Sequence, residues 1–193
     1  MENMNAYDFD NTVFYGDSTA KFYIFELKRH PKIILKTPSL FGAFAKYYIF
    51  RKGSKTDFKQ TMYRFLTCIK DIDGEVEAFW NINIDNIKPF YLEQKKTDDV
   101  IISASPEFLL SPVCKKLGLK YLIASRVDKN TGKYNGINCH GKEKVRRYYE
   151  EFGETDVEEF YSDSYSDTPM AEIAIKAFMV KKDEISPWDF EKK

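Results

Sequence analysis

Residues 98–105 read DDVIISAS, a short run of mostly apolar, β-branched residues that ends in small side chains. The apolar residues do not alternate with polar ones, which is typical of a strand buried on both faces of a parallel sheet. Ser105 and Pro106 follow as the expected start of a helix, with Ser105 as its cap, and Gly118 is expected to end it. The stretch therefore predicts a strand followed by a helix, the unit from which parallel α/β folds are built.

The same alternation continues toward the C-terminus. Strands are expected at 120–125, 157–164 and 178–182, and helices at 144–152 and 168–177. A further short strand is expected at 5–9, near the start of the chain. Alternating strands and helices favour a parallel α/β sheet.

Residues 17–90 differ from the rest, because apolar side chains recur there at helical spacing with few strand signals. Helices are expected at 18–30, 39–52, 56–69 and 74–87. The aromatic residues of this block most simply form a small helical core. The alternative is that they form a hydrophobic pocket or a membrane-facing surface, with Arg51 and Lys52 at its edge.

Composition limits the function classes. Thirty basic residues balance thirty acidic ones, so the chain lacks the basic excess of a nucleic-acid-binding protein. The widely spaced Cys68, Cys114 and Cys139 match neither a disulfide framework nor a zinc site. We expect reduced thiols in a cytoplasmic protein, because no secretory signal is visible. The longest apolar stretch, 41–50, is too short to span a bilayer, and we do not expect membrane association. The oligomeric state is not predicted.

Acidic residues follow two of the expected strands. The segment YDFDNT places Asp8 and Asp10 two residues apart, and Asp163 and Asp167 follow the strand at 157–164. Because the carboxyl ends of parallel strands face one crevice, these carboxylates should meet there and repel one another unless a cation neutralises them. An oxygen-only ligand set is typical of Mg²⁺.

The same crevice has the groups that phosphoryl transfer needs. One aspartate of the N-terminal pair can bind the ion and act as a nucleophile, while its neighbour handles protons. Ser103 can bind a phosphate oxygen through its hydroxyl group, and the amide of Ala104 can donate a second hydrogen bond. Lys144 supplies a positive charge against the developing negative charge.

Four segments in order, DFDNT, IISAS, GKEKV and YSDSYSD, resemble the four motifs of the haloacid dehalogenase superfamily of phosphohydrolases. SASPEFLLSPVCKKLGL, TGKYNGINCHGKEKVRR and SDSYSDTPM narrow the resemblance to the branch that contains phosphoserine phosphatase. It implies a Rossmann-like, three-layer parallel sheet with an inserted all-helical cap. Residues 1–16 and 91–193 would form the catalytic core, and residues 17–90 the cap.

Carried over by position, the resemblance implies Asp8 as the nucleophile and Asp10 as the general acid and base. Asp8, the backbone carbonyl of Asp10, Asp163 and Asp167 would hold Mg²⁺, Asp167 directly or through water. Ser103, Ala104 and Lys144 would bind the phosphoryl group; Lys142 fits the motif spacing less well. Asp17 would contact the substrate, although its segment GDS equally favours a turn and a helix cap.

Departures from the family pattern concern the substrate. Ser162 stands where the family often has glycine, which should be tolerated, and Ala104–Ser105 replace a common glycine pair beside the phosphate. The expected function is Mg²⁺-dependent hydrolysis of a small, phosphoserine-like phosphomonoester through an aspartyl-phosphate. The alternatives are a phosphatase of a lipid-linked phosphate headgroup, a phosphoacceptor signalling domain and a non-catalytic binding protein. His30 and His140 are expected to be structural or surface residues.

Overall fold

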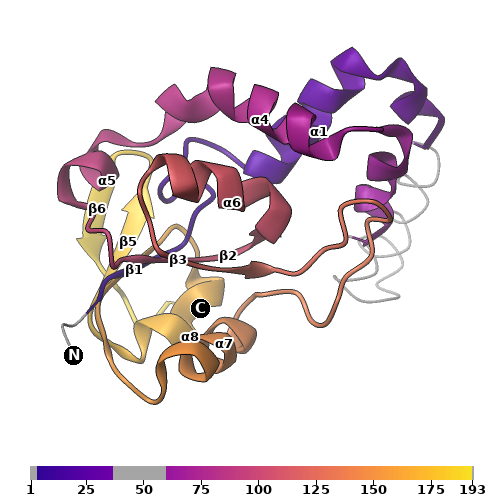
Figure 1. The fold of residues 1–193 in the computed structure, drawn as a ribbon. Helices are drawn as coiled ribbons and strands as arrows, with labels where there is room; N and C mark the ends of the chain where they lie inside the picture. The colour runs from indigo at the N-terminus through magenta and orange to yellow at the C-terminus, as the bar shows by residue number, and fades with distance from the viewer. Residues whose placement is uncertain (1–3, 37–59, 193) are drawn as a thin grey trace.

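A six-stranded sheet runs through the computed structural model, which describes residues 4–36 and 60–192 (Figure 1). Its strands are β1 (Ala6–Tyr7), β2 (Val100–Pro106), β3 (Tyr121–Ser125), β4 (Val157–Ser162), β5 (Ala174–Lys181) and β6 (Glu184–Pro187). They lie in the order β3-β2-β1-β4-β5-β6, and all pairs are parallel except β5 with β6. The predicted α/β class with a parallel sheet is confirmed.

Helices cover both faces of this sheet. They are α1 (Ser18–Arg29), α4 (Ile72–Asn83), α5 (Pro89–Gln94), α6 (Glu107–Lys116), α7 (Lys142–Phe152) and α8 (Thr168–Ala171). Short 3₁₀ turns join them: η1 (Pro31–Lys36), η3 (Arg64–Cys68), η4 (Ile84–Asn86) and η5 (Tyr165–Asp167). In Figure 1, α4 and α6 lie above the sheet, and α7 and α8 below it.

Strand β2, which is buried except for the half-buried Ala104, separates two apolar cores. Ile101 belongs to the core shared with α6 and α4, whereas Val100 and Ile102 belong to the core shared with α7 and α8. Successive side chains of a strand point to opposite faces, so an uninterrupted apolar run is what a sheet covered on both sides requires. The apolar residues 100–102 thereby hold together three layers: the sheet and the helices on each of its two faces.

The predicted helix at 168–177 is wrong beyond its first turn. It begins at Thr168 with proline in its first turn, as expected, but ends at Ala171. Strand β5 starts at Ala174 and pairs with β4 from Val157 to Ser162. Pairing with a neighbouring strand outweighed the local helical preference of this segment, which tertiary context commonly does.

The helical prediction for 17–90 holds for the residues that the structure describes. The segment expected at 39–52 lies outside them, as does most of the first half of the one at 56–69; residues 60–63 are helical and continue into η3. Trp80 of α4 packs against Phe9 and Phe14 and donates a hydrogen bond from its indole nitrogen to the carbonyl of Leu109, at 2.6 Å. The described aromatic residues of the block therefore belong to a core that is continuous with one face of the sheet.

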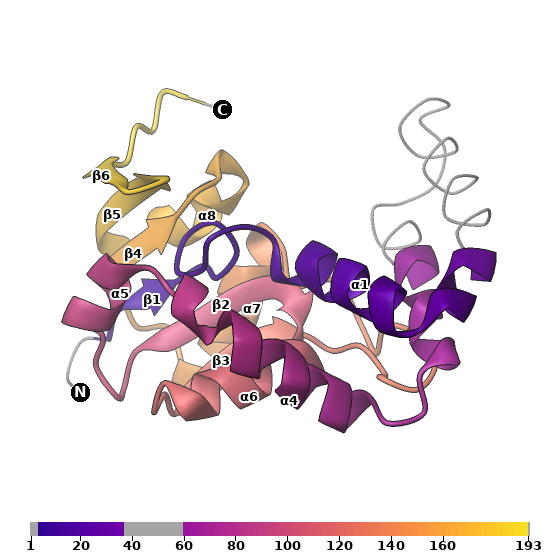
Figure 2. The same ribbon diagram turned by 90° about the horizontal axis from the view of Figure 1, so that it is seen from above.

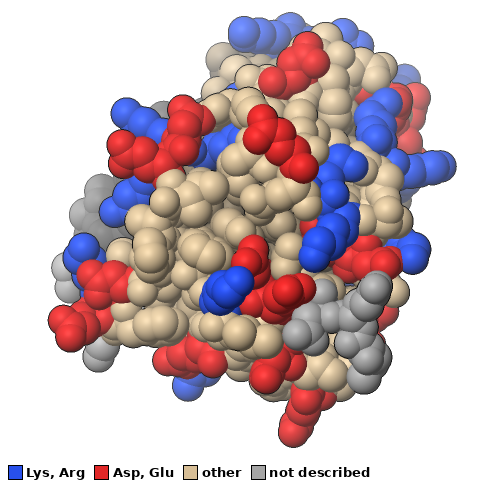
Figure 3. Space-filling view, turned by 90° about the vertical axis from the view of Figure 1, so that its left-hand side faces the viewer, with Lys and Arg blue, Asp and Glu red and all other residues tan. Residues whose placement is uncertain are grey.

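Charges of both signs are interspersed on the face shown in Figure 3, with no extended basic patch there. Among the helices that the structure describes, none has an apolar stretch of the length needed to cross a bilayer.

Candidate active site

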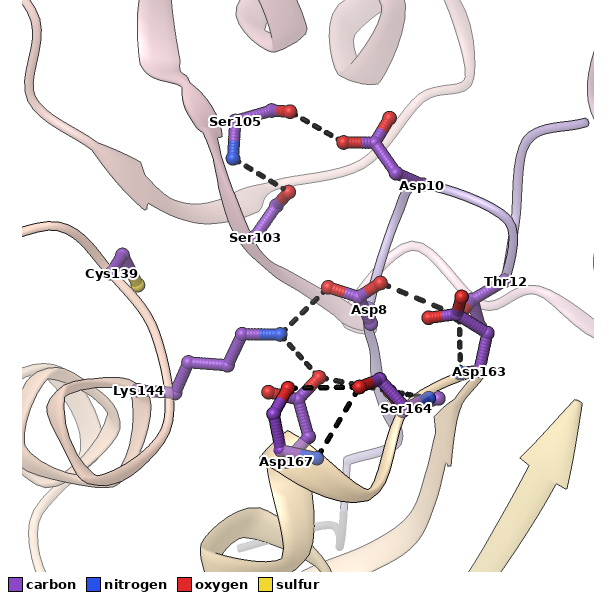
Figure 4. Close-up of polar contacts among 12 residues, drawn as sticks. Asp8, Asp10, Thr12, Ser103, Ser105, Cys139, Lys144, Asp163, Ser164 and Asp167 are labelled. Carbon is purple, nitrogen blue, oxygen red and sulfur yellow. Dashed lines mark hydrogen bonds and ion pairs between the residues drawn. The ribbon is translucent and has the colours of Figure 1, made fainter. Parts of the chain in front are cut away.

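The ends of β1, β2 and β4 meet the first turn of α7 around one pocket of about 340 Å³ (Figure 4). All eight residues predicted from the sequence for the site line this pocket: Asp8, Asp10, Asp17, Ser103, Ala104, Lys144, Asp163 and Asp167. Segments more than 150 residues apart in the chain thus contribute to one pocket, as the order of parallel strands predicts.

Lys144 supplies a positive charge to this pocket. Its Nζ donates to Asp8 Oδ1 at 2.6 Å and to Asp167 Oδ2 at 2.7 Å. Burial lowers the pKa of Lys144, but the charges of Asp167 and Asp8 outweigh that effect and raise the pKa above its ordinary value. Lys142, in contrast, is exposed. The geometry therefore places Lys144, and not Lys142, beside the carboxylates of the pocket.

Asp8 directly follows β1, and its amide donates to the carbonyl of Tyr161 on β4 at 2.9 Å. This bond fixes the backbone at the point where the side chain enters the pocket. Burial raises the pKa of Asp8 to about 7, against the opposing effect of Lys144. Asp8 shares Lys144 with Asp167, so a single positive charge faces two buried carboxylates. Ionising Asp8 is therefore costly in the metal-free protein.

Asp10 lies in the loop after Asp8 and is held through both carboxylate oxygens. The amide of Ser18, at the start of α1, donates to Oδ1 at 2.7 Å, and the hydroxyl group of Ser105 donates to Oδ2 at 2.5 Å. Burial raises the pKa of Asp10 to about 6, and the charge of Asp17 adds to the shift. A fixed carboxyl group of this kind can give and take a proton at a defined place.

The predicted role of Ser105 as a helix cap is wrong. Pro106 is the N-cap residue of α6, and it has no side-chain capping bond. The Ser105 hydroxyl group points to Asp10 instead, and the Ser105 amide donates to Ser103 Oγ at 3.1 Å. A hydrogen bond to the half-buried Asp10 carboxylate stabilises this serine more than capping would, because charged acceptors form the stronger bonds.

Lys88 holds the loop that carries Asp10 through the backbone of Asn11. Asn11 has a φ of 58°, a left-handed conformation that asparagine tolerates better than most residues. The buried Lys88 donates from Nζ to the carbonyl of Asn11 and to that of Lys182, each at 2.5 Å. Burial lowers the pKa of Lys88. This lysine ties the loop to the β5–β6 turn, and nothing in its sequence context predicted that.

Two acids complete the pocket on the β4 side. The amide of Asp163 donates to Thr12 Oγ1 at 2.9 Å, and Thr12 in turn donates to Asp8 Oδ2 at 3.4 Å. The hydroxyl group of Ser162 donates to Asp167 Oδ2 at 2.8 Å. Ser162, where the family often has glycine, is therefore accommodated as a support for Asp167.

The residues present fit a divalent metal ion. Asp8, Asp163 and Asp167 line the pocket together, and burial is the main cause that raises the pKa of both Asp8 and Asp163. The buried Oδ1 of Asp167 has no hydrogen-bond partner among the described residues. Several carboxylates facing one lysine, with an unsatisfied oxygen among them, are the donor set of a hard cation.

Asp17 serves as a helix cap and also lines the pocket. Its Oδ1 accepts a hydrogen bond from the amide of Ala20 at 2.8 Å, as the residue types of GDS favour. His140, expected to be a structural or surface residue, lies in the pocket lining as well. Thr12, Ser18 and Ser162 were not predicted as supports for the acids, although Thr12 and Ser162 lie within the motif segments DFDNT and YSDSYSD.

The profile of the haloacid dehalogenase-like hydrolases matches residues 6–172, which span all of the strand ends described above. The chain belongs to this family of hydrolases. The predicted family is thereby confirmed, and with it the prediction that the protein is a hydrolase.

The individual proteins that resemble this chain have low sequence identity to it. Protein CicA of Caulobacter vibrioides is 27% identical over 188 residues, covering 88% of this chain and 82% of that protein. The crystal structure of a Bordetella pertussis Tohama I protein of unknown function matches with a TM-score of 0.71 at 18% identity. The match covers 90% of this chain and 87% of the Bordetella chain. A phosphoserine phosphohydrolase-like protein from Francisella tularensis has a TM-score of 0.54 at 15% identity, covering 92% and 86%. The Bordetella and Francisella structures share the fold of this chain.

Proposed function

We propose that this hydrolase is a Mg²⁺-dependent phosphatase that cleaves a small phosphomonoester through an aspartyl-phosphate on Asp8. The observation that carries the proposal is the contact of Lys144 with both Asp8 and Asp167 at 2.6 and 2.7 Å. A lysine between a nucleophilic carboxylate and metal-binding acids is placed to neutralise a phosphoryl group during transfer.

In the first step, a carboxylate oxygen of Asp8 attacks phosphorus and the ester P–O bond breaks. Asp10 gives its proton to the leaving oxygen. Ser103, the amide of Ala104 and Lys144 hold the phosphoryl oxygens during the transfer. The product alcohol then leaves, and the phosphoryl group remains on Asp8.

In the second step, Asp10 takes a proton from a water molecule that attacks the same phosphorus. The P–O bond to Asp8 breaks, which releases inorganic phosphate and regenerates the free carboxylate of Asp8. The bonds from Ser18 and Ser105 hold Asp10 in one place for both proton transfers. Asp8, the carbonyl of Asp10, Asp163 and Asp167 would hold the Mg²⁺, which when bound neutralises the acids and polarises the phosphoryl oxygens.

The pocket size and lining favour a small phosphorylated metabolite, phosphoserine-like in size. A volume of about 340 Å³ is at the lower end of ligand pockets. Asp17, Thr19, Met62 and Tyr63 form its wall on the side of residues 17–90, where we infer that the helical segment acts as the cap over the core of 1–16 and 91–193. A cap excludes water and contacts the part of the substrate that does not react.

Phosphate release from a panel of phosphorylated amino acids, sugars, nucleotides and lipid headgroups tests the proposal. We expect turnover with Mg²⁺, loss of turnover with a chelator, and a hydroxylamine-labile phosphoenzyme in acid-quenched samples. Asp8→Asn should abolish turnover, whereas Asp98→Asn, an exposed aspartate remote from the pocket lining, should not. Turnover by Asp8→Asn at the wild-type rate would contradict the mechanism, and preference for a lipid headgroup would contradict the substrate class.

A further inference from the structure

A second group of metal-ligating side chains lies at the other end of α1, away from the pocket. Glu26 and His30 are four residues apart at the C-terminus of α1, and Glu75 comes from the first turn of α4. Figure 2 shows α1 and α4 side by side. A 12-residue helix is about 18 Å long, so this cluster is separate from the pocket at the N-terminus of α1.

The ligand atoms of the three side chains converge. His30 Nε2 lies 3.1 Å from Glu75 Oε1 and 3.5 Å from Glu26 Oε2, and all three ligand atoms lie within 4.8 Å of one another. In a tetrahedral zinc site with bonds of about 2.0–2.1 Å, neighbouring ligand atoms are about 3.3 Å apart. The two measured distances bracket that separation.

Glu26 supplies an independent sign that something is bound there. Its side chain is fully buried, and both of its oxygens lack a hydrogen-bond partner among the described residues. An unpaired buried carboxyl group is expensive unless a proton or a cation satisfies it. Glu26 Oε2 nevertheless faces the His30 ring, in the same small space as the Glu75 carboxylate.

The surroundings hold the other two ligands in place. Arg29 Nε donates to Glu75 Oε2 at 2.6 Å, and a second, longer bond of 3.2 Å runs from Arg29 Nη2 to Oε1. The amide of His30 donates to the carbonyl of Glu26 at 2.7 Å, which fixes the register of the two α1 ligands. The His30 side chain is 31% exposed, so water can reach the position of a fourth ligand. Supports of this kind orient the ligands of metal sites.

We propose that Glu26, His30 and Glu75 bind one divalent ion of the zinc class, with water as the fourth ligand, and that this ion clips the end of α1 to α4. The histidine nitrogen favours zinc or a similar transition metal over Mg²⁺. The clip holds a helix whose other end donates a hydrogen bond to Asp10, through Ser18. The site does not depend on the proposed phosphatase activity.

Zinc titration of the metal-stripped full chain tests this inference, with a large molar excess of Mg²⁺ present to occupy the acidic pocket. Calorimetry should show one equivalent of Zn²⁺ bound, together with a rise in melting temperature. Co²⁺ in place of Zn²⁺ should give the intense visible absorption of a four-coordinate site with a nitrogen ligand, which an oxygen-only octahedral site lacks.

Glu26→Gln and His30→Ala should each weaken zinc binding, by roughly 100-fold or more, since loss of a supporting residue alone costs 10- to 100-fold. Glu77→Gln, an exposed glutamate half a turn further along α4, is the matched control and should bind zinc as the wild type does. Glu26→Gln keeps the side-chain shape, and circular dichroism verifies that it is folded. Wild-type zinc affinity in folded Glu26→Gln, or no zinc bound by the wild type, would overturn the proposal.

Discussion

The two acidic clusters of this chain differ in the atoms that accompany their buried carboxylates. In the pocket, Asp8 and Asp167 share Lys144. At the other end of α1, Glu75 takes the contacts of Arg29 and leaves Glu26 without a hydrogen bond among the described residues. Each cluster therefore has more carboxylates than cations in contact with them, and burial raises the pKa of Asp8 and of Glu26 to about 7.

The comparison teaches that the ligand atoms, and not the shortage of positive charge, set what each cluster can bind. The acids of the pocket offer oxygen ligands alone, and a lysine and serines that suit a phosphoryl group lie beside them. The α1–α4 cluster offers an imidazole nitrogen and no group for binding phosphate among its three members. The first set is expected to take Mg²⁺ for chemistry and the second a structural transition metal.

Replacing the proposed nucleophile should have the largest effect. Asp8→Asn is expected to lower kcat/KM by at least about 10⁴-fold, in the range that loss of a covalent nucleophile costs. Glu26→Gln, the equivalent change in the other cluster, should keep the activity. Steady-state kinetics on the substrate found in the panel provides the measurement. Equal losses in the two variants would erase the distinction between the clusters.

Asp10→Asn should separate proton transfer from binding. We expect kcat to fall by roughly 10²- to 10⁴-fold, because general acid–base catalysis contributes about that much. The dissociation constant for inorganic phosphate should change far less. An unchanged kcat with a collapsed affinity for phosphate would instead make Asp10 a binding residue.

Lys144→Met should destabilise the protein, because it leaves Asp8 and Asp167 buried without a cation. Removing one partner of a buried ion pair costs about 3–5 kcal/mol. Urea unfolding of the metal-free protein should show a smaller loss at pH 5 than at pH 8, since protonation relieves the stranded acids. Lys142→Met, at an exposed position on the same helix, is the control and should stay within about 0.5 kcal/mol of the wild type.

Glu26→Gln should have the smallest effect and the opposite sign. Burial, with the charge of Glu75 as a second cause, raises the pKa of Glu26 from its ordinary 4.5 to about 7. Between these pH values the folded state binds more protons than the unfolded state, so the free energy of unfolding falls as pH rises. The variant lacks this titration and should be more stable than the wild type at pH 7 in the absence of zinc, by on the order of 1–3 kcal/mol.

Chemical denaturation of wild type and variant at several pH values, in the presence of a chelator, measures that difference. Glu77→Gln should keep the wild-type dependence on pH, because its exposed side chain pairs with Lys116 at the surface. A stability difference between wild type and Glu26→Gln that does not change between pH 4.5 and 7 would show that Glu26 does not hold its proton in the folded state.

Some predictions succeeded because they depended on local patterns whose physics does not change on folding. The apolar run at residues 100–102 is typical of a strand covered on both sides, and β2 has that environment. The strand ends gathered the predicted residues, because parallel strands direct their carboxyl ends to one edge. The segment at 168–177 was mispredicted since its spacing suited a helix, whereas pairing with β4 decided otherwise.

The sequence alone predicted the parallel α/β class, the family and the set of acids, serine and lysine that line the pocket, because the succession of strands, helices and motifs along the chain is a one-dimensional property. The tertiary structure alone decided that Ser105 and Ser18 bind Asp10, that Lys88 holds the Asn11 loop, and that Glu26 meets His30 and Glu75. Apart from Ser18 with Asp10 and Glu26 with His30, these contacts join segments tens of residues apart through side-chain geometry and burial. No periodicity or spacing in a chain encodes which of those distant atoms will lie within hydrogen-bond distance.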